Sequence, residues 1–239
     1  AANLDKDYEW ISEHKKDFDV ELNNVSEDTA ILALQGPKAI GILQKLTETD
    51  LDKIGFFYLE EDVKINGVNA MISRTGYTGE DGFEIYVPND GVVKVWKDVL
   101  EAGKEEGLVP TGLGSRDTLR FEANLPLYGQ ELSADISPLE ARLKFFVKLN
   151  KEADFIGKDV LIKQEEEGVE RISVGFELLE RGIPREGYEV HKNGEKIGYV
   201  TTGYMSPTLG KSIGNALIKS SEKEIGNEID IMVRKRAVK

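Results

Sequence analysis

The stretch SRTGYTGEDGFEIYVP, residues 73–88, places charged and aromatic side chains beside three glycines, Gly76, Gly79 and Gly82. Glu84 follows Gly82 and Phe83 at the start of a strand-like run, and its carboxylate can accept hydrogen bonds from a paired donor edge of a ligand, as carboxylates do from arginine. Tyr77 adds a flat apolar face with a polar tip. Because glycine loses the most backbone entropy on folding, we expect a tight turn or the close approach of a ligand here. The alternative for Glu84 is a solvated carboxylate on a strand surface.

A second stretch, GLGSRDTLRFEANLPLYGQEL at residues 112–132, predicts a short helix that Ser115 could cap. Arg116 then lies in the first turn, where a positive charge opposes the helix dipole. Structure alone seldom selects that placement, so Arg116 is a candidate for binding a ligand carboxylate. The alternative is an ion pair with Asp117, Glu122 or another acid.

Composition excludes several kinds of chemistry. The 239 residues carry 31 basic and 44 acidic side chains, a formal net charge of −13, which argues against nucleic-acid partners because these are held by clustered cations. The absence of cysteine removes disulfides, thiolate nucleophiles and most zinc sites. The two histidines, His14 and His191, are far apart, so we predict no metal site. Chemistry must rest on carboxylates, arginine, tyrosine or a bound cofactor.

The hydropathy pattern gives an expectation for location. No apolar run approaches the roughly 18 residues of a membrane span, and no charged-then-apolar leader begins the chain. We therefore expect no membrane association and a cytoplasmic location.

The first part of the chain has the pattern of an α+β fold. Residues 4–16 and 38–46 have helical apolar spacing, and residues 29–37 and 82–87 resemble strands. Residues 63–74 predict a hairpin, because an Asn-Gly pair supplies the positive φ angles of a type I′ turn. We expect an antiparallel sheet covered by helices.

A long amphipathic helix is predicted after these strands. Residues 90–107 place four apolar side chains on one face: Val92, Val95, Trp96 and Leu100. Gly107 lies where we expect this helix to end.

The sequence pattern changes from helical to strand-like near residues 165–170. Residues 154–168 predict a short helix, and short alternating runs punctuated by glycine follow: residues 171–179, 188–203, 211–219 and 227–235. These runs predict a small C-terminal β-barrel. The predicted domains are an α+β region at residues 1–167 and the β-barrel domain at residues 168–239.

Five motifs, in this order and spacing, resemble the aminomethyltransferase (T protein) family of the glycine cleavage system: SRTGYTGEDGFEIY, GLGSRDTLRFEANLPLYGQEL, VKLNKEADFIGKDVL, RGIPREGYEV and VTTGYMSPTLGKSIGNALI. The resemblance covers nearly the whole chain. It implies a cloverleaf of α+β regions and a C-terminal β-barrel around a central folate site. It also implies transfer of a one-carbon unit from the aminomethyl-lipoyl arm of H protein to tetrahydrofolate, with release of ammonia and formation of 5,10-methylenetetrahydrofolate. The resemblance further implies that no metal takes part.

The resemblance assigns roles to individual residues. Glu84 matches the folate-binding glutamate of the family, and the glycines near it would let the pterin approach. Arg116 matches a ligand-contacting arginine, and Asn3 matches an asparagine beside the pterin pocket. Tyr77 and Tyr128 belong to the matching motifs and are further candidates for the folate site.

The catalytic aspartate of the family lies in an N-terminal segment that has no counterpart here. We therefore expect the chain to be the larger C-terminal part of such an enzyme, lacking on the order of 100 residues. We expect this part alone to be inactive and to bind tetrahydrofolate weakly. Two alternatives stay open: a non-catalytic folate-binding or docking module, and another folate-dependent enzyme of the superfamily that demethylates dimethylglycine or sarcosine. The folate-binding proteins of iron–sulfur assembly are excluded, because their Lys-Gly-Cys-Tyr signature needs a cysteine.

Overall fold

A computed structural model describes residues 2–233 and 236–239. The chain forms two compact units, the first ending at Thr111 and the second beginning at Gly112. The domain division predicted at residues 167 and 168 stays a prediction.

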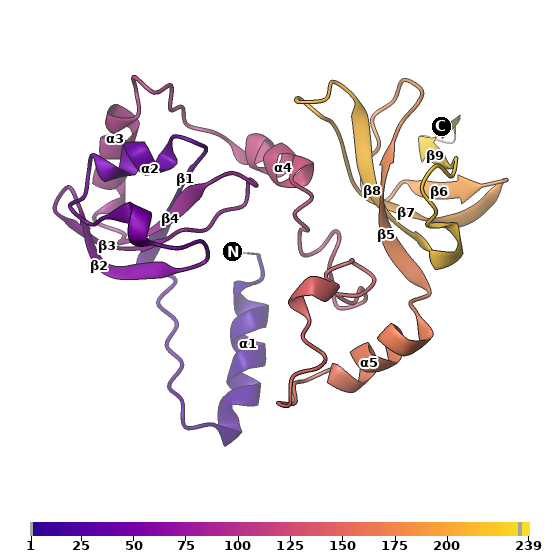
Figure 1. Ribbon diagram of the computed structural model, residues 1–239, viewed down its shortest axis with the longest axis horizontal. Coiled ribbons are helices and arrows are strands. Elements are labelled where there is room, and N and C mark those ends of the chain that lie inside the picture. The colour runs from indigo at the N-terminus through magenta and orange to yellow at the C-terminus, as the bar shows by residue number, and fades with distance from the viewer. Residues whose placement is uncertain (1, 234–235) are drawn as a thin grey trace. The chain divides into compact units, whose positions relative to one another are not determined.

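The first unit is built on a four-stranded antiparallel sheet in the order β1-β4-β3-β2. Its strands are β1 (Thr29–Gln35), β2 (Leu59–Ile65), β3 (Val68–Ser73) and β4 (Gly82–Pro88). The helices α2 (Ala39–Gln44) and α3 (Val92–Ala102) pack on the sheet and on each other (Figure 1). The short helix η2 (Leu51–Lys53) follows α2.

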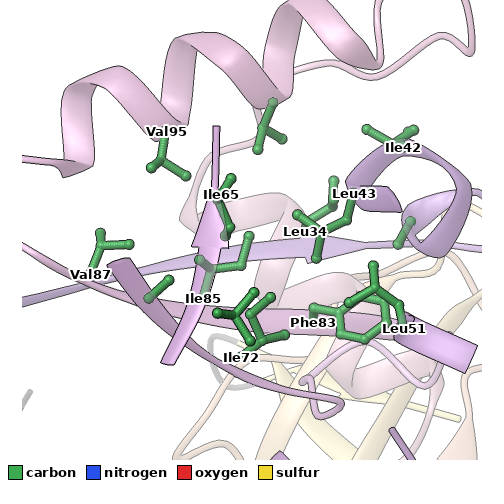
Figure 2. Packing of buried hydrophobic residues seen from close by; sticks show 14 of the residues in the cluster. Leu34, Ile42, Leu43, Leu51, Ile65, Ile72, Phe83, Ile85, Val87 and Val95 are labelled. Atoms are coloured by element: carbon green, nitrogen blue, oxygen red, sulfur yellow. The ribbon is translucent and has the colours of Figure 1, made fainter. Parts of the chain in front are cut away.

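The core of this unit includes every second side chain of β4, because successive side chains of a strand point to opposite faces of the sheet. Phe83, Ile85 and Val87 are at most 1% exposed and point into the same apolar space as Val95 of α3 and Leu43 of α2 (Figure 2). Full burial of such a side chain stabilises a fold by about 1.5–3 kcal/mol. Since successive strand residues face opposite sides, this burial directs the intervening side chains of β4 away from the core.

The hairpin between β2 and β3 is confirmed. Asn66 and Gly67 have φ angles of 45° and 88°, the two positive values that a type I′ turn requires. Glycine or asparagine tolerates this left-handed region best, which is why the pair marks the turn in the sequence.

The helix predicted at residues 90–107 is present, but two details of the prediction were wrong. Val95 and Val99 are its buried residues, whereas Trp96 is 42% exposed because it lies a further 100° around the helix. The helix ends at Ala102, before Gly107, because Leu108 folds back and donates its backbone N–H to the carbonyl of Gly103 at 2.9 Å. Gly107 has a φ angle of 84° and lies in the turn after the helix.

The predicted first helix is α1 (Leu4–His14), which is followed by η1 (Lys15–Asp17). Asp5 and Asp7 lie in its first turn, where the helix dipole favours negative charge. None of the residues of α1 is buried. The apolar face that predicted this helix is therefore largely open to solvent in this structure.

The second unit begins with α4 (Leu113–Glu122), η3 (Lys144–Phe146) and α5 (Lys158–Glu167). A six-stranded antiparallel sheet follows, in the order β10-β9-β6-β7-β8-β5. Its strands are β5 (Arg171–Glu177), β6 (Glu189–Lys192), β7 (Glu195–Met205), β8 (Ser212–Lys219), β9 (Asp230–Val233) and β10 (Arg236–Val238), with η4 (Ser220–Glu222) after β8. Of the strand predicted at residues 227–235, Arg234 and Lys235 lie outside the described residues.

The two ends of this sheet curl toward each other. Leu179 and Glu180, just beyond β5, donate their backbone N–H groups to the carbonyl of Lys239, just beyond β10, at 2.7 and 3.1 Å. The sheet is therefore barrel-like, and the buried side chains inside it include Val190, Val200 and Ile231. The predicted fold class, an antiparallel sheet with helices followed by a small β-barrel domain, is confirmed.

Two glycines of this sheet provide a test of its packing. A Cβ at Gly198 of β7 would lie 2.1 Å from the carbonyl oxygen of Leu217, while a Cβ at Gly175 of β5 would meet only Asn215 at 3.7 Å. Gly198→Ala should lower the free energy of unfolding by about 1–3 kcal/mol, because the backbone of β8 must move. Gly175→Ala, the matched control, should leave it nearly unchanged. Urea denaturation of both variants measures the difference, and equal values would contradict the close packing of β7 on β8.

Candidate functional site

Glu84 lies on the face of β4 that points away from the helices. Its neighbours across the sheet are Ala33 of β1 and Ser73 of β3. The hydroxyl of Thr75 donates to Glu84 Oε2 and lies 2.9 Å from Ser73 Oγ. Within the part of the chain that the structure describes, Glu84 Oε1 accepts no hydrogen bond. The partly buried carboxylate thus keeps one oxygen available for a donor.

Tyr86 continues this face two residues along β4. It lies opposite Ile31 and Met71 of the neighbouring strands, and Ile31 is 56% exposed. Burial, together with the charge of Glu84, raises the pKa of the Tyr86 hydroxyl. The tyrosine therefore stays neutral at physiological pH. A flat ligand with a hydrogen-bond donor edge could lie on the apolar part of this face and donate to Glu84.

Two glycines, Gly76 before β4 and Gly82 at its start, make room for the side chain of Gln35. A Cβ at Gly76 would lie 1.9 Å from the Gln35 amide oxygen, and a Cβ at Gly82 would lie 2.6 Å from its amide carbon. The amide nitrogen of Gln35 donates to the carbonyls of Thr75 and Phe83 at 3.1 and 3.3 Å. In this structure, two of the three glycines therefore accommodate a side chain of β1.

The loop between β3 and β4 is closed by an ion pair. Arg74 Nε and Nη2 donate to the two carboxylate oxygens of Asp81 at 3.0 and 2.7 Å, and Arg74 Nη1 donates to the carbonyl of Ile54 at 2.9 Å. The guanidinium also lies 4.6 Å from the ring centre of Phe56. The hydrogen bonds from Arg74 lower the pKa of Asp81, more than burial raises it. This pair fixes both ends of the loop that carries Tyr77.

The other candidates of the first unit lie on different elements. Asn3 is the residue before α1, and its carbonyl accepts the N–H of Asp7 at 2.9 Å, while its side chain makes no capping hydrogen bond. Tyr77 is partly buried in the loop that Arg74 and Asp81 close. Glu84 and Tyr77 are thus presented by one loop and the strand that it enters.

Arg116 and Tyr128 belong to the second unit. Arg116 is exposed, and its backbone N–H donates to the carbonyl of Gly112 at 3.2 Å. Gly112, not Ser115, is the N-terminal residue before α4, so the predicted Ser115 cap was wrong. Tyr128 is 41% exposed and pairs with Leu132 in an isolated bridge.

Arg120, one turn after Arg116, is a residue that sequence reasoning missed. It is fully buried and donates to Asp117 at 2.7 Å and Glu131 at 2.9 Å. Further donations reach Gln130 at 2.6 Å and Thr202 of β7 at 3.2 Å. Burial would lower the pKa of Arg120, but the neighbouring carboxylates raise it overall. The network ties α4 to the barrel-like sheet.

Asp117 and Glu122, the predicted partners for Arg116 in an ion pair, have other partners. Asp117 accepts from Arg120 and from the hydroxyl of Tyr204, and Glu122 accepts from Ser206 and Thr208. Burial and the Asp117 hydrogen bond raise the pKa of Tyr204 to about 12. Burial would raise the pKa of Asp117, but Tyr204 and Arg120 hold it below its ordinary value. Arg116 still favours the ionised form of Asp117 through its charge.

Two kinds of feature are absent from residues 2–233 and 236–239. No helix in that range is both long and apolar enough to cross a membrane. No group of three or more histidine or acidic side chains there could hold a metal ion.

Comparisons with known families match both parts of the chain. Residues 1–151 match the family described as the GCVT N-terminal domain, and residues 171–239 match the glycine cleavage T-protein C-terminal barrel domain. Both are domains of one class of protein. The chain therefore belongs to the glycine cleavage T-protein family.

The relatives of the chain support this membership. It is 62% identical to the aminomethyltransferase of Alkaliphilus metalliredigens and 59% identical to that of Thermoanaerobacter pseudethanolicus, each over all 239 residues. It spans 65% of the length of these relatives. The crystal structure of glycine cleavage system aminomethyltransferase T from Bartonella henselae superposes with a TM-score of 0.86 at 28% identity, over 100% of this chain and 64% of that one.

The ion pair between Arg74 and Asp81 predicts that the free energy of unfolding depends on pH. Because the pKa of Asp81 is lowered in the folded state, its contribution to stability is present above the ordinary pKa of about 3.9 and is lost as the pH falls through the folded value. Asp81→Asn should lower the free energy of unfolding by about 1–3 kcal/mol at pH 7, and this difference should shrink below about pH 4. Urea denaturation between pH 7 and pH 3 measures it. Glu80→Gln, in the same loop, is the control, and a difference that does not change with pH would contradict the prediction.

Proposed function

We propose that the protein containing this chain is an aminomethyltransferase of glycine cleavage. It takes the aminomethyl group carried on the dihydrolipoyl arm of H protein and passes the one-carbon unit to tetrahydrofolate. The observation that carries the proposal is the match of both domain families, supported by the partly buried Glu84 carboxylate, which has one available oxygen on the sheet face opposite the helices.

The reaction balances without an oxidant or a metal. The carbon–sulfur and carbon–nitrogen bonds of the aminomethyl group break, and two carbon–nitrogen bonds form to N5 and N10 of tetrahydrofolate. The two N–H protons that are displaced go to the lipoyl sulfur and to the departing amine. The products are 5,10-methylenetetrahydrofolate, ammonia and the dihydrolipoyl arm. The folate supplies the nucleophilic nitrogens, so the protein must chiefly orient the reactants and stabilise charge.

Glu84 is proposed to bind the pterin ring. The amino group and the adjacent ring N–H of a pterin form a paired donor edge, which a carboxylate can accept. Thr75 holds Oε2 and leaves Oε1 available, and Tyr86 provides a neutral aromatic side chain on the same face. The residues present fit the pterin in their chemistry.

Arg116 is proposed to bind a carboxylate of the substrate, and Asn3, Tyr77 and Tyr128 are further proposed contacts of the folate site. The proposed partners are lipoylated H protein and tetrahydrofolate, and the proposed location is the cytoplasm. The catalytic aspartate is proposed to lie in a part of the protein that this chain does not contain, so the chain alone should be inactive.

The direct test is to assay 5,10-methylenetetrahydrofolate formation by the intact protein with aminomethylated H protein and tetrahydrofolate. Turnover is the expected result. Tight folate binding without turnover would instead identify a non-catalytic folate-binding module. Turnover with dimethylglycine or sarcosine in place of H protein would identify a demethylating enzyme of the superfamily.

Replacement of Glu84 tests the pterin contact. Glu84→Gln in the intact protein should weaken tetrahydrofolate binding about 10- to 100-fold, because the charged acceptor of the donor edge is lost. Titration calorimetry measures the dissociation constant. Glu80→Gln, an exposed acid of the preceding loop, should bind as the unaltered protein does. An unchanged constant for Glu84→Gln would identify Glu84 as a solvated strand carboxylate.

Replacement of Arg116 separates ligand binding from structural support. Arg116→Lys should lower kcat/KM by about tenfold or more, because lysine cannot reproduce the planar fork that binds a carboxylate. The thermal midpoint should change by less than about 2 °C, since Arg116 is an exposed side chain. Kinetics with saturating H protein and thermal unfolding are measured on the same variant. A lowered midpoint with intact turnover would contradict the ligand-binding role.

A further inference from the structure

A hollow of about 600 Å³ lies wholly within the second unit, beside the end of α5 and the beginning of η4. Leu139, which is buried, contributes an apolar side chain to its lining. Seven polar side chains contribute to its lining: Arg142, Lys144, Gln164, Glu165, Ser220, Ser221 and Lys223.

The charges around this hollow are unbalanced. Lys144 pairs with Glu165, which also lines the hollow, so these two charges offset each other. Arg142 and Lys223 have no ion-pair partner among the residues that the structure describes. In a chain with a net charge of −13, two unpaired cations that line the same hollow form a local positive site.

The backbone of Arg142 supports a binding role. Its φ angle is 61°, in the left-handed region that favours glycine and is costly for a long side chain. Hydrogen bonds hold this conformation: the N–H of Arg142 donates to the carbonyl of Leu139, and the N–H of Leu143 donates to that of Pro138, at 3.1 and 2.7 Å. Strained residues held by their surroundings are concentrated at ligand-binding positions.

An unsatisfied acceptor lies at the same place. Gln164 Oε1 is buried and has no hydrogen-bond partner in the described part of the chain. A buried acceptor without a donor is unfavourable, so a ligand that brings a hydroxyl or an N–H would be favoured here. Ser220 donates to the carbonyl of Val169 at 2.5 Å, which fixes the start of η4 beside the hollow.

We propose that this hollow binds a small anionic metabolite. Its phosphate or carboxylate group is held by Arg142 and Lys223, and a hydroxyl or N–H of the same molecule donates to Gln164 Oε1. This proposal stands independently of the proposed one-carbon transfer, because none of these residues is assigned to the folate site.

Three probe anions test the proposal on the intact protein at constant ionic strength. Glycerol phosphate and citrate each combine an anionic group with a hydroxyl, whereas sulfate has no donor. Titration calorimetry should show saturable binding of glycerol phosphate or citrate in the millimolar range or tighter, and weaker binding of sulfate. Tighter binding of glycerol phosphate would identify the natural ligand as a phosphate, and tighter binding of citrate would identify it as a carboxylate.

Variants of the hollow identify the site. Arg142→Gly and Lys223→Gln should each weaken binding about tenfold or more, because a charge-assisted hydrogen bond is lost. Arg142→Gly also relieves the positive φ angle, so its thermal midpoint should not fall. This variant separates loss of binding from loss of folding.

Lys163→Gln is the matched control, because Lys163 lies on α5 outside the hollow and pairs with Glu167 at 3.8 Å. It should bind the probes as the unaltered protein does. Absence of saturable binding at millimolar concentrations, or equal binding by the two hollow variants and the control, would overturn the proposal. Sulfate binding as tight as that of the other probes would contradict the role of Gln164.

Discussion

The first unit depends on one constraint, the alternation of buried and outward-facing side chains along β4. Phe83, Ile85 and Val87 are buried between the sheet and its helices, so the two-residue period of the strand directs Glu84 and Tyr86 to the other face. A slip of one residue in register would bury the carboxylate and expose the core. The pairing of β4 with β1 and β3 therefore stabilises the fold and presents the candidate site through the same backbone hydrogen bonds.

The second unit depends on a buried positive charge. Arg120 is shielded from water and is compensated by Asp117 and Glu131, which in turn accept from Tyr204 and from Thr201 and Thr202. Removing one partner of such a network leaves an uncompensated buried charge, which is strongly destabilising. Because Arg116 lies one helical turn before Arg120, the network that fixes α4 on the sheet also determines where Arg116 projects.

Much of the fold could be predicted because its signals are local. The Asn66–Gly67 turn, the alternation of β4 and Gly168, the last residue of the helix predicted over residues 154–168, each depend on residues close together in the chain. The fold class followed from these signals and from the family motifs. The sequence could not predict that the side chain of Gln35 packs against Gly76 and Gly82. Gln35 is 41 and 47 residues away from these glycines in the sequence, and only the pairing of β1 with β4 brings them together.

By itself, the sequence determined the order of the elements, the two kinds of domain and the residue types available for chemistry, because backbone propensities and apolar spacing act over short ranges. Only the tertiary structure decided which polar side chains are occupied by internal partners. Asp81 is paired with Arg74, Asp117 with Arg120 and Tyr204, while Glu84 keeps one oxygen available. The physical reason is that a hydrogen bond needs atoms within about 3 Å of each other, and long-range packing of sheets and helices sets those distances.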